Sequence, residues 1–210
     1  MTDRVPLDFD PSVRQLRALL LGVTDDDLTA STPCDRWSVG DLLDHLMVLS
    51  LAFTQVARKE SGAPGTAVPA PEPSAVHLPS HWRSQLPALL EDLATAWKHP
   101  GAWAGTAQAD GVTRPASELA AVAINELTVH GWDLARATGQ DFAADPRILH
   151  ALAEFLSPQR AADRAAATGA MTDLEDEPTL LAKVVGLTGR DPNWRPGGRR
   201  RRGREARDAA

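Results

Sequence analysis

A carboxylate, an imidazole and a second carboxylate lie along one face of a long apolar segment. Glu126, His130 and Asp133 stand at positions i, i+4 and i+7, which fall on the same side of an α-helix. The same face continues through the apolar residues Leu119, Val122, Ala123, Leu134 and Ala137. A carboxylate without a partner in such a stripe costs several kcal/mol. The segment therefore predicts a buried helix whose polar groups are compensated, and a divalent cation is the obvious candidate.

Four long segments of the chain place apolar residues at helical spacing. They cover residues 10–22, 38–57, 81–98 and 115–138, and shorter helices are expected at 146–156 and 178–187. Residues 61–80 contain five prolines and are expected to form a loop, and residues 101–111 are expected to form a connection. We find no convincing strand alternation. The pattern predicts an all-α fold, a four-helix bundle with short additional C-terminal helices.

Residues that favour helix ends support these boundaries. Asp10-Pro11 is typical of a helix start with proline in the first turn. Ser38 and Asp41 have the spacing of a capping box. Thr24 and the three aspartates after it indicate a further short helix start. Gly139 follows the last long segment, where glycine commonly ends a helix.

The charge of the chain is divided between an acidic body and a basic end. Residues 195–210 hold seven arginines against two acidic residues, a net charge of +5, so the total of −6 leaves −11 on residues 1–194. An acidic body argues against a broad nucleic-acid-binding face. We expect residues 1–194 to form the bundle and residues 195–210 to be a basic, disordered tail, although such a tail could also touch nucleic acid or an anionic surface.

The composition also bears on the cellular compartment. No run approaches 18 apolar residues, so a membrane span is not expected. The first residues lack the apolar core of a secretion signal. Cys34 is the only cysteine, which excludes an internal disulfide. Together these features favour the cytoplasm.

His45 brings a third candidate ligand from a second helix. Its neighbours at helical spacing, Leu42, Leu49, Ala52 and Val56, are all apolar, so the imidazole should point into the bundle. With Glu126 and His130 it completes a His₂Glu set, the ligand count of a catalytic zinc site with one open position. A lone histidine on an apolar face is nevertheless more often a core residue than a ligand. Glu126 and His130 could likewise form only a buried hydrogen bond.

Other polar residues leave alternatives open. Asp133 could orient His130 or line a cavity, or it could cap a polar patch or pair with Arg136. Cys34 has no histidine near it in sequence and should lie roughly 10 Å or more from His45, so we expect a packed or turn cysteine. His77 and His81 flank Pro79, which makes helical spacing between them improbable. No Gly-x-Ser-x-Gly elbow is present.

Two longer motifs resemble a known superfamily. Residues 32–46, TPCDRWSVGDLLDHL, and residues 125–139, NELTVHGWDLARATG, are similar to the motifs of DinB-like, metal-binding four-helix bundles. They look closest to the branch that contains the N-terminal domain of mycothiol-dependent maleylpyruvate isomerase. Residues 187–194, LTGRDPNW, provide a third, weaker match. The resemblance spans about residues 10 to 194.

The resemblance implies a function as well as a fold. It implies a divalent ion, zinc or nickel, held by His45, Glu126 and His130, with an open position for water or the thiol of a small cofactor such as mycothiol. The isomerase carries a further C-terminal domain for which this chain has no room, so maleylpyruvate isomerisation itself is not expected.

We therefore expect a metal-dependent enzyme, a transferase or isomerase-like protein, that acts on a small-molecule substrate with a small thiol. A non-catalytic metal-binding bundle that serves as a sensor, scavenger or interaction module is the alternative. A metal-free bundle is a third interpretation. Related bundles often pair, so a homodimer is also considered.

Overall fold

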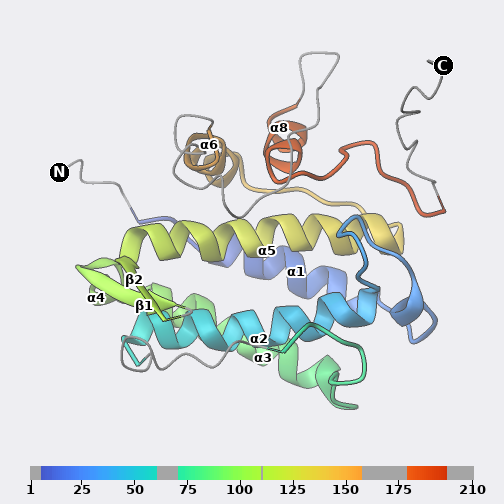
Figure 1. The fold of residues 1–210 in the computed structure, drawn as a ribbon, viewed down its shortest axis with the longest axis horizontal. Helices are drawn as coiled ribbons and strands as arrows, with labels where there is room; N and C mark the ends of the chain where they lie inside the picture. The colour runs from blue at the N-terminus through green and yellow to red at the C-terminus, as the bar shows by residue number, and fades with distance from the viewer. Residues whose placement is uncertain (1–5, 61–70, 110, 158–178, 198–210) are drawn as a thin grey trace, which may run out of the picture.

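The computed structural model describes residues 6–60, 71–109, 111–157 and 179–197. Four long helices form its body: α1 (Asp10–Leu21), α2 (Val39–Arg58), α3 (Trp82–Trp97) and α5 (Ala116–Thr138). Figure 1 shows α2 running alongside α5, with α1 and α3 completing the bundle. The predicted all-α four-helix bundle is confirmed, and each long helix begins and ends within about two residues of its expected bounds.

Local capping explains where two of these helices begin and end. The Asp41 backbone N–H donates to Ser38 Oγ at 3.2 Å, and the Ser38 backbone N–H donates to Asp41 Oδ2 at 2.8 Å, which is the predicted capping box of α2. Gly139 ends α5 with φ of 68°, in the left-handed region. Helix α1 differs slightly from expectation, because Phe9 occupies the N-cap position and Asp10 lies in the first turn.

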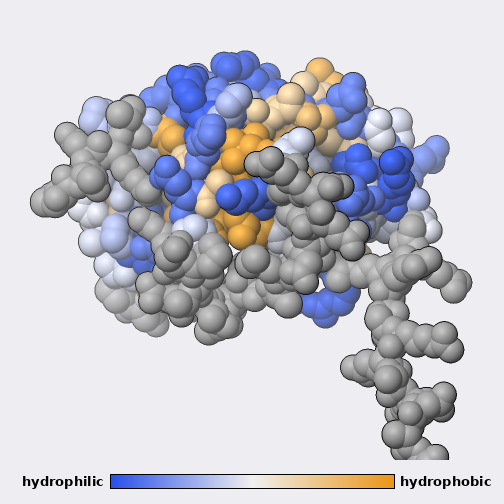
Figure 2. All heavy atoms as spheres, turned by 90° about the horizontal axis from the view of Figure 1, so that it is seen from above, coloured by the Kyte–Doolittle hydropathy of each residue, from blue (hydrophilic) through white to orange (hydrophobic). Residues whose placement is uncertain are grey.

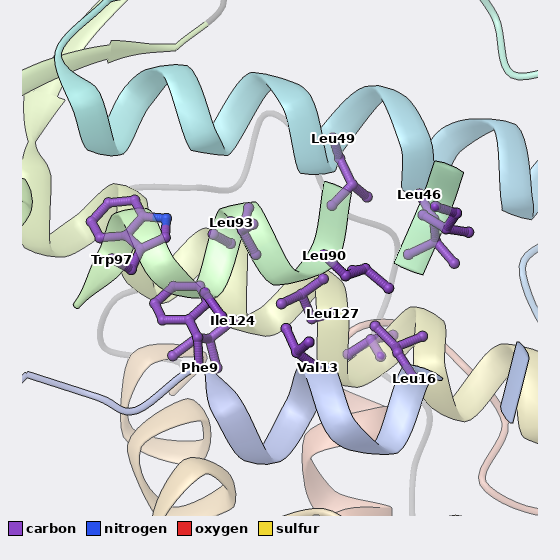
Figure 3. Packing of buried hydrophobic residues seen from close by; sticks show 14 of the residues in the cluster. Phe9, Val13, Leu16, Leu46, Leu49, Leu90, Leu93, Trp97, Ile124 and Leu127 are labelled. Atoms are coloured by element: carbon purple, nitrogen blue, oxygen red, sulfur yellow. The ribbon is translucent and has the colours of Figure 1, made fainter. Parts of the chain in front are cut away.

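The core lies between the four long helices. In Figure 3, Val13 and Leu16 of α1 and Leu127 of α5 point toward the same interior as Leu90 of α3 and Leu46 of α2. Each fully buried leucine contributes about 1.5–3 kcal/mol relative to exposure. At one end of the core, Phe9 stacks on Trp97 with ring centroids 5.4 Å apart. Apolar packing therefore fixes the position of α2 relative to α5.

A short helix and a β-hairpin connect α3 to α5, and the sequence patterns did not predict the hairpin. Helix α4 (Pro100–Trp103) precedes β1 (Thr106–Ala109) and β2 (Val112–Pro115), which pair antiparallel with Thr106 opposite Pro115. The expectation of no strand was wrong here. The reason is that each strand has four residues and β2 is exposed throughout, so neither strand needs an alternating apolar pattern.

Two shorter helices cover the outer side of α5. They are α6 (Pro146–Phe155) and α8 (Leu180–Leu187), as expected, and they lie next to each other above α5 in Figure 1. Seen from that side, hydrophobic atoms occupy the middle of the described surface and hydrophilic atoms surround them (Figure 2). A one-turn 3₁₀ helix, η1 (Asp26–Thr29), follows α1 and matches the predicted short helix start.

Several expectations fall partly outside the described residues. Of the proline-rich loop, residues 71–80 form turns without helix or strand, and residues 61–70 lie outside the description. Most of the basic end, residues 198–210, also lies outside it, so the division at residue 194 stays a prediction. Within the described residues, α2 alone is long and apolar enough to cross a membrane, but 61% of that window is buried in the bundle, as in the core helix of a soluble protein.

Candidate metal centre

The three predicted ligands converge where α2 packs against α5. His45 comes from α2, and Glu126 and His130 come from successive turns of α5. One ligand atom of each lies within 4.8 Å of the other two. Glu126 Oε2 is 3.0 Å from His130 Nε2 and 3.5 Å from His45 Nε2, so both imidazoles face one carboxylate oxygen.

These separations suit a small divalent cation. Zinc binds imidazole nitrogen and carboxylate oxygen at about 2.0–2.2 Å, which places neighbouring donors of a tetrahedral site about 3.3 Å apart. The two measured separations, 3.0 and 3.5 Å, lie on either side of that value. Two imidazoles and one carboxylate also form a donor set that zinc and nickel accept. The residues present therefore fit the cation that the sequence predicts, although the ligand role itself stays a prediction.

Exposure differs from one side of this cluster to the other. The side chains of His45 and Glu126 are 25% and 29% exposed, whereas those of His130 and Asp133 are 6% and 0% exposed. A cation between the three ligands would thus have protein behind it and solvent in front of it. Among the described residues three side chains converge here, which is the number of protein ligands that catalytic zinc sites use.

Trp37 forms an aromatic wall beside the two imidazoles. Its ring centroid lies 4.7 Å from that of His45 and 5.7 Å from that of His130. Arg36, just before it, has φ of 71°, a left-handed conformation that is uncommon for a residue with a side chain. The turn before α2 thus directs an indole toward the candidate ligands.

Asp133 holds the opposite edge of the His130 ring. Its Oδ2 lies 3.0 Å from His130 Nδ1 and accepts a hydrogen bond from Arg190 Nη2 at 3.1 Å. Asp133 thus contacts His130 and not Arg136, whose side chain donates to the Trp194 carbonyl. A carboxylate on Nδ1 fixes the ring and directs the Nε2 lone pair to the cation side.

The ionisation of the cluster follows from its hydrogen bonds. Burial raises the pKa of Glu126, but hydrogen bonds from His130 and His45 outweigh it and hold that pKa well below its usual range. Burial lowers the pKa of His130, yet the hydrogen bonds to Asp133 and Glu126 raise it to about 9 overall. Without a cation, His130 is therefore protonated near neutral pH and, together with Arg190, balances the charges of Glu126 and Asp133.

Cys34 lies closer to the cluster than the sequence indicated. Its sulfur, a nitrogen of His130 and an oxygen of Asp133 form a second group whose atoms lie within 4.8 Å of one another. The sequence-based expectation was a distance between Cys34 and His45, which is near in sequence. The fold instead brings Cys34 next to His130, which lies on another helix. Burial raises the pKa of the Cys34 thiol to about 11, with Arg190 opposing it, so this thiol is not an activated nucleophile.

Gly131 and Trp132 serve packing on the other faces of α5. A Cβ at Gly131 would lie 3.0 Å from Phe142 Cε2 and 3.5 Å from Leu16 Cδ2, so the glycine permits close approach of α1 and the segment after α5. Trp132 is buried. Both residues therefore serve packing around α5.

Comparison with known proteins places this arrangement in a family. The model of the mycothiol maleylpyruvate isomerase N-terminal domain matches residues 9–135, which include all three candidate ligands. The chain belongs to this family. Crystal structures of the mycothiol-dependent maleylpyruvate isomerase share the fold. One has a TM-score of 0.65 at 19% identity over 88% of each chain. A histidine-to-alanine mutant has a TM-score of 0.57 at 19% identity, over 74% of this chain and 69% of that one.

Relatives in sequence come from Mycobacterium tuberculosis. An uncharacterized protein in strain CDC 1551 / Oshkosh and one in strain ATCC 25618 / H37Rv are each 28% identical to this chain over 131 residues. The match covers 62% of this chain and 65% of each relative, so the chain spans less than two thirds of their length. The family membership rests on the family model and the shared fold on the crystal structures, whereas these relatives specify no reaction.

Sequence reasoning missed Arg190, as it missed the positions of Trp37 and Cys34 beside the candidate ligands. Arg190 lies in the loop after α8 and contacts Asp133, 57 positions earlier in the chain. The weak motif at residues 187–194 contains it, and that motif was the available signal. The local sequence Gly-Arg-Asp-Pro is typical of an exposed turn. It does not indicate that the loop after α8 brings this arginine next to α5.

Proposed function

We propose that this protein is a cytoplasmic, divalent-metal-dependent enzyme that uses a low-molecular-weight thiol such as mycothiol to attack an electrophilic small molecule. In that role it would be a transferase or an isomerase-like enzyme. One observation carries the proposal: His45, Glu126 and His130 converge within 4.8 Å and keep one exposed side. Membership in a family named for a mycothiol-using isomerase supports the choice of thiol.

The protein residues have distinct tasks in this proposal. His45 Nε2, the Glu126 carboxylate and His130 Nε2 would hold zinc or nickel. Asp133 would retain the proton on His130 Nδ1, so that the opposite nitrogen stays available. A bound divalent cation would lower the pKa of a coordinated thiol and favour the thiolate, which is the nucleophilic form.

The environment of the cluster would support this chemistry. The buried His130–Asp133 side keeps water from the back of the site, while the exposed His45–Glu126 side admits the thiol and its substrate. The Trp37 indole beside His45 provides a flat apolar surface against which an unsaturated substrate could pack. The thiol sulfur and the electrophilic carbon would then meet at the exposed side.

The first test measures the cation and its dependence on His45. Untagged protein purified without added metal is expected to contain about one zinc or nickel per chain by elemental analysis. His45→Ala should lose most of it, because a two-ligand site binds weakly. His150→Ala, an exposed histidine on α6, is the matched control and should keep the metal. Metal-free wild-type protein, or equal metal in both variants, would contradict the proposal.

The second test separates an enzyme from a non-catalytic metal-binding bundle. Calorimetry with the metal-loaded protein should detect binding of mycothiol and none of its S-methyl derivative, which cannot form a thiolate. Loss of thiol binding in His45→Ala would indicate that the thiol binds at the same centre. A loaded protein that binds neither compound, and catalyses no conjugation of the thiol to electrophiles, would favour the sensor or scavenger role.

A further inference from the structure

Two sets of side chains that could hold a cation overlap at His130. The first is His45, Glu126 and His130; the second is Cys34, His130 and Asp133. They use opposite edges of one imidazole, since Nε2 faces Glu126 and Nδ1 faces Asp133. A neutral imidazole offers one lone pair and keeps a proton on the other nitrogen. A neutral His130 can therefore bind a cation through one of its two nitrogens but not through both.

The second set contains the stronger donors for zinc or nickel. A cysteine thiolate is a softer ligand than a carboxylate, and thiolate ligands select zinc-like ions. Asp133 is fully buried, and its Oδ1 has no hydrogen-bond partner among the described residues, so this oxygen is available as a ligand. Donor chemistry alone would thus draw the cation away from the exposed side.

Arg190 contacts two of the three residues of the second set. Its Nη2 lies 3.1 Å from Asp133 Oδ2 and 3.7 Å from Cys34 Sγ. Its Nη1 donates to the Thr188 carbonyl at 3.2 Å, and the side chain is 17% exposed, so the guanidinium is held in place from the loop after α8. A permanent positive charge therefore contacts both the thiol and the carboxylate.

We propose that Arg190 keeps a divalent cation out of the Cys34–His130–Asp133 set and so reserves His130 for the exposed His45–Glu126 set. The proposal rests on the proposed function, because it presupposes a cation at that exposed set. Repulsion by the guanidinium and its contacts with Sγ and Oδ2 both act against a cation at this set. By holding Asp133 it also leaves that carboxylate as the acceptor of the His130 Nδ1 proton. The loop after α8 thereby determines which edge of His130 binds metal.

Cobalt(II) absorption spectra test this inference, because thiolate coordination adds an intense near-ultraviolet charge-transfer band that nitrogen and oxygen donors lack. Wild-type protein with one equivalent of Co²⁺ should show d–d bands without that band, and Cys34→Ser should have the same spectrum. Arg190→Gln, which removes the charge but keeps an amide donor, should gain the thiolate band. Cys34→Ser in the Arg190→Gln background should lose it again.

Controls separate the charge from the fold. Arg190→Lys keeps a cation and should leave the thiolate band absent. Arg147→Gln removes an arginine bound to Asp145 on the exposed surface of α6 and should behave as wild type. The comparison of the cobalt spectra of wild-type protein and Cys34→Ser does not require a variant at Arg190. It therefore still tests the inference if Arg190→Gln does not fold.

The outcomes distinguish this inference from the proposed function. A thiolate band in wild-type protein that disappears in Cys34→Ser would overturn the role of Arg190. Co²⁺ binding by wild type and folded Arg190→Gln alike, without the band in either, would also overturn it and leave the proposed function intact. Absence of Co²⁺ binding by folded wild-type protein would refute the proposed function, and with it this inference.

Discussion

The ion pair between Arg190 and Asp133 provides a quantitative test of how the C-terminal segment stabilises the bundle. Asp133 is 0% exposed and Arg190 is 17% exposed, so Arg190→Met would leave a buried carboxylate with one charged partner fewer. Removing one member of a buried ion pair costs about 3–5 kcal/mol. Since His130 still contacts Asp133 Oδ2, we expect the lower end, about 3 kcal/mol, or roughly a 150-fold change in the unfolding equilibrium.

Neutralising the carboxylate should recover part of that loss. When Asp133→Asn is added to Arg190→Met, no buried carboxylate is left unpaired, and the oxygen of the introduced amide can still accept from His130. We expect the double variant to be more stable than Arg190→Met alone by about 1 kcal/mol or more, within the range of coupling energies for contacting residues. The exposed pair Arg114 and Glu118, replaced by Met and Gln, serves as the control and should couple by less than about 0.5 kcal/mol.

Urea unfolding of the metal-free protein with a chelator present, followed by circular dichroism and tryptophan fluorescence, gives these free energies. The m-values should agree among variants, so that the differences reflect stability alone. Losses that simply add in the double variant would show that Asp133 and Arg190 are energetically independent. That result would contradict the geometry on which the account of this pair depends.

Three further predictions concern single groups. Because the pKa of Cys34 is raised to about 11, iodoacetamide should alkylate it slowly at pH 8 and about tenfold faster per pH unit up to pH 10. Mass spectrometry of the intact protein measures this rate. A rate that reaches a plateau below pH 9 would contradict the burial of the thiol. The pKa of His130 is raised from 6.5 to about 9, so the stabilisation of metal-free protein by protonated His130 should be full below pH 6.5 and lost as the pH rises to 9. His130→Gln should remove this pH dependence of urea unfolding. If the pH dependence persists in that variant, the assignment to His130 is refuted. Gly139→Ala should destabilise the protein by about 1 kcal/mol, because φ of 68° is unfavourable for a residue with a Cβ, whereas an unchanged thermal midpoint would mean that the end of α5 relaxes.

The bundle could be predicted because its information is local. Apolar residues at helical spacing decide which face of each long helix is buried, and capping residues such as Ser38 and Gly139 decide where helices begin and end. The hairpin at residues 106–115 could not be predicted in the same way. Its strands are short and largely exposed, so they are stabilised by pairing and by contact with α2 and α5 rather than by an alternating pattern.

The candidate site likewise contains residues that local sequence patterns predict and residues that they do not. One face of one helix carries Glu126, His130 and Asp133, and His45 is expected on the bundle-facing side of another helix. Their convergence follows once the two helices pack. Contacts made across the fold are different. The positions of Cys34 and Arg190 depend on the turn before α2 and on the loop after α8, and no periodicity in the sequence encodes either. The choice between Arg190 and Arg136 as the partner of Asp133 needed the tertiary structure.

Anomalous scattering from a crystal of the untagged protein, measured at the zinc and nickel absorption edges, would identify the cation and its ligands. We expect one ion, bound by His45 Nε2, the Glu126 carboxylate and His130 Nε2, with no fourth protein ligand and an exogenous ligand on the exposed side. An ion on Cys34 and Asp133, or imidazoles of His45 and His130 that share no ion, would contradict it.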